Sequence, residues 1–140
     1  MAKKNDIIDV TPIEHVKKPW GHYENVRSFG QHAKLKILTV EPGHRMSYQS
    51  HQHRDEIWIP VQGCGLAFIS NDEEEGDVAQ AFLLAPGTGI TEIAAGQKHQ
   101  IDNRGGEEPL VIVEVQLGDR CEEDDITRYS DDYGRADEQE

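Results

Sequence analysis

Apolar and polar residues alternate along much of the chain, in short runs separated by turns. The clearest run is 110–117, where one face of an extended strand would be wholly apolar. That face carries Val111, Val113, Val115 and Leu117, and the opposite face carries Leu110, Ile112, Glu114 and Gln116. Similar runs predict strands at 33–41, 65–70, 78–84 and 90–93, with Gly- or Pro-containing turns between several of them. Regular short strands broken by turns predict an all-β sandwich or barrel.

The segment 43–63 contains two histidines two positions apart, His51 and His53. In an extended strand, side chains at i and i+2 point to the same face. Both imidazoles are therefore expected to share one side with Gln49, and Glu56 joins that side only if the chain turns a corner at 54–55. Two imidazoles and a carboxylate are a donor set that binds metals.

A second segment, 94–103, supplies a third imidazole. Its alternation places His99, Ile101 and Asn103 on one face. Protein sites for zinc, iron, manganese or nickel commonly combine three or four N/O ligands with an open position. Together the two segments predict one site for a divalent transition metal.

Both segments carry short motifs in a recognisable order. In the first, Gly43, His51, His53, Glu56 and Gly63 resemble the first cupin motif, and in the second, Gly96, His99 and Asn103 resemble its partner motif. The runs KPWGHYE, SYQSHQHRDEIW, EVQLG and DDITRYSDDYGR resemble, more narrowly, the cupin domain of type II mannose-6-phosphate isomerases. The likeness covers about residues 17 to 135. It departs from the cupin pattern at Ala94, where a proline is usual, and the short spacing from His53 to Glu56 is that of the isomerase branch.

This resemblance implies a double-stranded β-helix, the cupin jelly roll, and a metal-dependent isomerase that interconverts mannose 6-phosphate and fructose 6-phosphate in nucleotide-sugar and polysaccharide precursor metabolism. It is a family often fused behind a guanylyltransferase domain. Zinc comes first among the metals, with manganese, cobalt, nickel and iron left open. The implied metal ligands are His51, His53, Glu56 and His99, with Gln49 as an alternative oxygen ligand.

Proton transfer and phosphate binding need further side chains. Glu114, together with Glu56, is a candidate acid–base residue. Any basic residue near the site could hold the phosphate group, and an arginine does so through two parallel hydrogen bonds. The candidates are Lys36, Arg45, Arg54 and Arg135.

Three other functions stay open at this point. A sugar-binding or regulatory cupin would bind its ligand without turnover. A cupin dioxygenase would use the same histidines and glutamate with ferrous iron. A metal-free sugar-nucleotide epimerase would have no need for three converging histidines.

The length of 140 residues suits one domain, for which we expect a partly flexible, irregular N-terminal arm over 1–17, a cupin domain over 18–135 and a disordered tail over 136–140. A short helical turn is expected at 122–128 in the acidic C-terminal part. The formal net charge of −13 argues against nucleic-acid binding. No run resembles a secretory signal or a membrane helix, so a cytoplasmic location is expected.

The row Ile57, Ile59 and Val61 lies on the face of its strand opposite Glu56. An exposed apolar row favours association with another molecule, and we expect a homodimer to bury it. Cys64 and Cys121 are far apart in sequence and are expected to be unpaired thiols.

Overall fold

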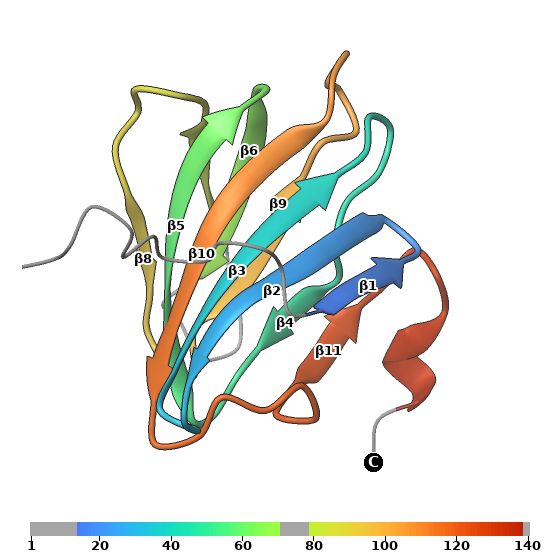
Figure 1. Cartoon of the computed structure of the whole chain (residues 1–140). Coiled ribbons are helices and arrows are strands. Elements are labelled where there is room, and N and C mark those ends of the chain that lie inside the picture. The colour runs from blue at the N-terminus through green and yellow to red at the C-terminus, as the bar shows by residue number, and fades with distance from the viewer. Residues whose placement is uncertain (1–13, 71–78, 139–140) are drawn as a thin grey trace, which may run out of the picture.

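Two antiparallel sheets make up the structure, a computed structural model that describes residues 14–70 and 79–138. The larger sheet has the order β1 (Glu14–Lys18), β2 (Gly21–Phe29), β3 (Ala33–Val40), β10 (Leu110–Gly118), β5 (Arg54–Gln62) and β8 (Thr91–Ile93). The smaller has the order β11 (Thr127–Ser130), β4 (Tyr48–Ser50), β9 (Lys98–Asp102), β6 (Gly65–Ser70) and β7 (Gln80–Leu84). A 3-10 helix, η1 (Arg135–Glu138), follows β11 (Figure 1).

The core lies between the two sheets. It joins Leu38, Trp58 and Ile112 of the larger sheet to Ile69 and Ile101 of the smaller. Burial of apolar area of this kind is the main stabilising contribution to such a fold. The all-β jelly-roll prediction is confirmed, and no helix in the described ranges has the length and apolar character to span a membrane.

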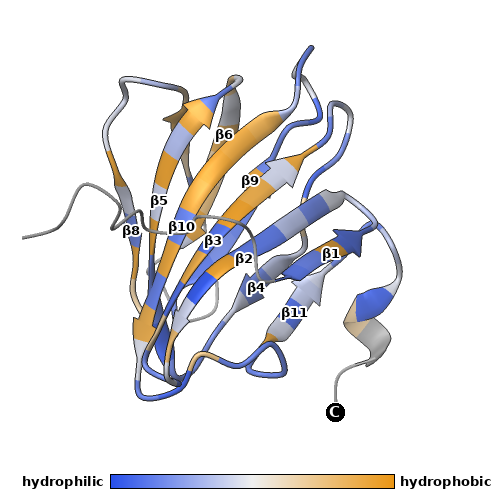
Figure 2. Cartoon of the chain, in the orientation of Figure 1, coloured by the Kyte–Doolittle hydropathy of each residue, from blue (hydrophilic) through white to orange (hydrophobic). Residues whose placement is uncertain are grey.

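The central strand β10 turns its mixed face inward. Its buried residues are Leu110, Ile112, Glu114 and Gln116, while the valine row faces the outside (Figure 2). In the antiparallel register, Glu114 lies opposite Lys36 of β3 on one side and Trp58 of β5 on the other. Charged and amide side chains therefore line one end of the interior, and the apolar core fills the other.

The predicted strand through both histidines is wrong in one respect. β4 ends at Ser50 and β5 begins at Arg54, so residues 51–53 form a bend between two strands of different sheets. The carboxylate of Asp125 holds this bend by accepting hydrogen bonds from the backbone N–H groups of Gln52 and His53, both at 2.9 Å. The corner expected at 54–55 is therefore displaced to 51–53, and the i, i+2 rule does not apply across it.

The ends of the chain also differ from expectation. The first strand, β1, already begins at Glu14, inside the expected arm. The helical turn expected at 122–128 is a tight turn followed by β11, and η1 occupies 135–138, where most of the tail was expected. The apolar patch at 7–10, the acidic loop at 71–77, Val78 and residues 139–140 lie outside the described residues.

Candidate metal centre and cavity

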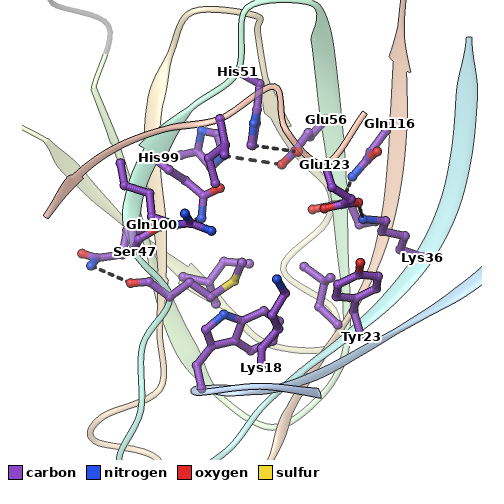
Figure 3. A pocket seen from close by; sticks show the side chains of 18 of the residues that line it. Lys18, Tyr23, Lys36, Ser47, His51, Glu56, His99, Gln100, Gln116 and Glu123 are labelled. Carbon is purple, nitrogen blue, oxygen red and sulfur yellow. Dashed lines mark hydrogen bonds and ion pairs between the residues drawn. The ribbon is translucent and has the colours of Figure 1, made fainter. Parts of the chain in front are cut away.

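A cavity opens between the two sheets, with about 670 Å³ of space free of protein atoms, including solvent at its mouth. One wall carries His51 and His99, and Lys18 and Tyr23 lie across the cavity from them (Figure 3). Trp20, Trp58 and Leu38 form part of its apolar lining.

His51, Glu56 and His99 converge at one side of the cavity, and all three are buried. Nε2 of His51 lies 3.3 Å from Oε2 of Glu56, and Nε2 of His99 lies 3.6 Å from Oε1 of the same carboxylate. The three donor atoms lie within 4.8 Å of one another. Metal–ligand bonds of about 2.0–2.2 Å would span these separations.

Both imidazoles are oriented by backbone carbonyl groups. Nδ1 of His51 lies 2.7 Å from the Asp125 carbonyl, and Nδ1 of His99 lies 2.9 Å from the Gln97 carbonyl. A carbonyl only accepts, so each Nδ1 must carry the hydrogen, and Nε2 of each ring is the atom that faces Glu56. Hydrogen bonds of this kind orient metal-binding histidines in proteins.

The electrostatics of the cluster favour metal-binding protonation states. Burial, followed by the charges of Arg54 and His99, lowers the pKa of His51 to about 3, so that ring is neutral near pH 7. Burial acts to raise the pKa of Glu56, but His99 and Arg54 outweigh it and lower that pKa, so Glu56 is a carboxylate. The lone pair of the neutral His51 ring and the Glu56 carboxylate face the same point, where they would stabilise a cation. These donors fit a divalent metal.

Arg54 already supplies one cation to the cluster. Its Nε donates to Oε2 of Glu56 at 3.0 Å, and its Nη2 lies 3.2 Å from Nε2 of His51. The guanidinium was expected to hold a phosphate group, but it is buried and engaged with the metal-type ligands. A metal bound to His51 would require Nη2 to leave that nitrogen.

Glu114 forms a buried carboxyl pair with Glu56. The indole Nε1 of Trp58 donates to both, at 3.2 Å to Glu56 and 3.1 Å to Glu114, and Gln116 donates to Glu114 at 2.7 Å. Burial, and then the Glu56 charge, raise the pKa of Glu114 to about 7. Glu114 can therefore hold or release a proton near neutral pH, as an acid–base residue must.

His53 lies outside this cluster, contrary to the predicted ligand set. Its ring is partly exposed, with Nδ1 3.2 Å from Asp119 and Nε2 2.6 Å from Arg120. The bend at 51–53 turns it away, because the two histidines do not share a strand. Gln49 is buried beside the cavity and donates to the Ser47 carbonyl at 3.4 Å.

The expected phosphate-binding residues divide into two groups. Lys36 and Arg135 line the cavity, as Arg54 does, but Arg45 does not: it pairs with Asp132 at an exposed position. The cavity also contains Lys18 and Arg128, which the sequence analysis missed. Lys18 stands in the quoted KPWGHYE run and Arg128 in DDITRYSDDYGR, so the motifs held a signal for both.

Comparisons with known proteins support the cupin fold. The chain aligns with the capsular polysaccharide assembling protein CapF from Staphylococcus aureus at a TM-score of 0.68 and 16% identity, over 84% of this chain and 34% of that one. It aligns with the Cnp3 cupin domain of Schizosaccharomyces pombe at 0.59 and 12% identity, over 70% and 64%. At these identities the likeness concerns the fold alone.

Sequence relatives are more specific. The chain is 40% identical over 121 residues to the xanthan biosynthesis protein XanB of Xanthomonas campestris pv. campestris, and 38% identical over 121 residues to a mannose-1-phosphate guanylyltransferase of Escherichia coli K12. Each match covers 86% of this chain but only 24% and 23% of the relative, so the chain spans about a quarter of their length. The sequence model described as "Mannose-6-phosphate isomerase C-terminal" matches residues 5–131, and the chain belongs to that family.

Proposed function

We propose that the chain is a metal-dependent aldose–ketose isomerase that interconverts mannose 6-phosphate and fructose 6-phosphate. The observation that carries this proposal is the convergence of His51, Glu56 and His99 beside the titratable Glu114 in one cavity. The family membership supports the choice of sugar. Guanylyltransferase activity is not proposed, because the chain spans only about a quarter of the relatives it matches.

His51, Glu56 and His99 would hold the metal, with zinc first and manganese, cobalt, nickel or iron as alternatives. When bound, a divalent metal polarises the sugar oxygens at C1 and C2. Glu56 suits the ligand role better than the acid–base role, because its lowered pKa keeps it ionised. The carbonyl groups of Asp125 and Gln97 would keep both imidazoles directed at the site.

Glu114 is the acid–base residue of the proposal. As a carboxylate it takes the proton from C2 of the aldose while the carbonyl oxygen at C1 takes a proton from solvent, which gives the enediol. Glu114 then returns its proton to C1, and the hydroxyl at C2 loses its proton to solvent, which gives the ketose. Trp58 and Gln116 hold both carboxyl oxygens of Glu114 in place during these transfers.

The test is exchange of the C2 proton of mannose 6-phosphate with deuterated solvent, followed by NMR alongside fructose 6-phosphate formation. Chelation should stop both, and added zinc, manganese or cobalt should restore them. Glu114→Gln should lower the rate by about 10²-fold or more, the usual scale for a general acid–base group. Glu92→Gln, at an exposed position on β8, is the matched control. A metal-loaded protein that binds the sugar phosphate without C2 exchange would exclude isomerisation.

A specific observation favours a second candidate, a sugar-phosphate binding protein without turnover. Arg54 places a cation against His51 and Glu56, so the cluster has a compensating charge without a metal. Such a protein would bind mannose 6-phosphate equally well with and without chelator. Measuring both mannose 6-phosphate binding and C2 proton exchange, with and without chelator, therefore separates the two functions.

A further inference from the structure

Positive charge gathers in the cavity of a chain that is acidic as a whole. Five cationic and three acidic side chains line the cavity, whereas the chain carries a formal net charge of −13. A local excess of cations inside an acidic protein raises the local concentration of anions. The charge distribution therefore points to an anionic ligand.

The cations are not equivalent. Arg54 pairs with Glu56, and the buried Lys36 contacts Glu123 and stacks over Tyr23, with its Nζ 4.0 Å from the ring centroid. Arg135 also has a carboxylate partner, Asp131, but Asp131 does not line the cavity, whereas Glu56 and Glu123 do. Arg54 and Lys36 are therefore neutralised within the cavity. They serve as walls of the cavity rather than as its free binding groups.

Lys18 differs from them. In the described part of the chain, no carboxylate lies within ion-pair distance of its ammonium group, whose nearest aromatic neighbour is Tyr23 at 5.9 Å. Burial is the largest cause of its lowered pKa; the charge of Glu123 opposes it, and the charges of Arg135, Arg128 and Lys36 add to it. Like charges held together at a cavity wall are stabilised by an anion placed among them.

Three separate elements bring these cations together. Lys18 ends β1, Arg128 lies in β11 and Arg135 begins η1, and all three line the same cavity. Asp131 fixes the Arg135 guanidinium by accepting from Nε and Nη2, both at 2.9 Å. Lys18 lies across the cavity from His51 and His99 (Figure 3).

We infer that Lys18, Arg128 and Arg135 form an anion subsite that takes the phosphate monoester end of the sugar, while its other end lies at His51, Glu56 and His99. This assignment rests on the proposed function for the identity of the sugar. Of the residues expected to bind phosphate it keeps Arg135, and it replaces Lys36, Arg45 and Arg54 with Lys18 and Arg128. Arginine and lysine donors of this kind make charge-assisted hydrogen bonds to phosphate.

Calorimetric titration of the full chain with inorganic phosphate, mannose 6-phosphate and mannose tests the subsite. Lys18→Gln should weaken binding of phosphate and mannose 6-phosphate by about tenfold, as expected for loss of one hydrogen bond to a charged group. Mannose binding should not change. Lys17→Gln is the matched control, because Lys17 is exposed on the opposite face of β1. Equal effects of the two substitutions would overturn the subsite.

Arg128→Gln, with the exposed Arg27→Gln as its control, gives a second and independent variant. Melting curves of all four proteins establish that they are folded. A protein that binds mannose 6-phosphate through Lys18 but exchanges no C2 proton would refute the isomerase and retain the subsite. A protein that isomerises with unchanged KM in Lys18→Gln and Arg128→Gln would refute the subsite and retain the isomerase.

Discussion

Nη2 of Arg54 lies 3.2 Å from Nε2 of His51, the ring nitrogen that a metal would bind. The Arg54 guanidinium and a metal would thus both contact the Glu56 carboxylate and the Nε2 lone pair of His51. Only one of them can occupy the space in front of His51. Arg54 is therefore expected to stabilise the metal-free protein.

Removal of the Arg54 guanidinium should show whether it competes with a metal for this site. Arg54→Gln leaves Glu56 buried without its ion pair, which costs about 3–5 kcal/mol when one partner of a buried pair is lost. We expect a lower melting temperature in chelator, and a larger rise on adding zinc than in the wild type. Arg104→Gln, which removes a more exposed arginine paired with Asp102, is the control. Equal zinc-induced shifts in Arg54→Gln and the wild type would show that the guanidinium and the metal do not compete.

The two histidines of the first motif should differ in metal binding. His51→Ala and His99→Ala should each lose the bound metal, because each removes one of the three converging donors. His53→Ala should retain it, since that ring contacts Asp119 and Arg120 instead. Elemental analysis after gel filtration measures the stoichiometry. Loss of metal from His53→Ala would show that His53 is a metal ligand after all.

Asp125 should make stability dependent on pH in the acid range. Burial acts to raise its pKa, but the backbone N–H groups of Gln52 and His53 outweigh it, so the folded-state pKa lies below the ordinary aspartate value of 3.8. A carboxyl group whose pKa is lowered by folding stabilises the fold at pH values above its unfolded-state pKa. This stabilisation is lost as the pH falls through the folded-state pKa. Asp125→Asn should therefore cost about 1–2 kcal/mol near pH 7. Denaturant unfolding should show this difference shrinking as the pH falls below 3.8, and a constant difference would contradict it.

The outer face of the larger sheet should mediate dimerisation. Ile59 and Val61 are exposed, and the half-buried Val113 of β10 lies opposite both Ile59 of β5 and the half-buried Ile37 of β3. Light scattering of the wild type should give twice the chain mass, and Ile59→Lys should give the mass of one chain. Ile90→Lys, at another exposed apolar position, should leave the dimer intact. A wild-type monomer at micromolar concentration would exclude this interface.

The sequence pattern predicted most strands well because their boundaries coincide with turns and their faces alternate. It failed at 51–53, where the geometry depends on Asp125, more than seventy residues away in the chain. No local periodicity carries such a contact, so His53 was assigned to the wrong side. Glu56 lies on the buried face of β5 with Trp58, but the corner that brings it there is at 51–53 rather than at 54–55.

Local sequence patterns also could not predict the full set of cations that line the cavity. Lys18, Arg128 and Arg135 lie on three elements that are distant in sequence, and only the fold brings them to one cavity. Arg45 was expected there as one of the basic residues near the site. Its side chain instead pairs with Asp132 at an exposed position.

The inward row of β10 has an evolutionary consequence. Glu114 and Gln116 occupy interior positions where leucine or valine would pack with less desolvation cost. Random substitution followed by selection for heat resistance alone should therefore enrich apolar residues at these two positions. The selected proteins should be more thermostable but inactive. Selection for turnover should keep them polar, so the pattern recovered in such a library would separate positions conserved for chemistry from those conserved for folding.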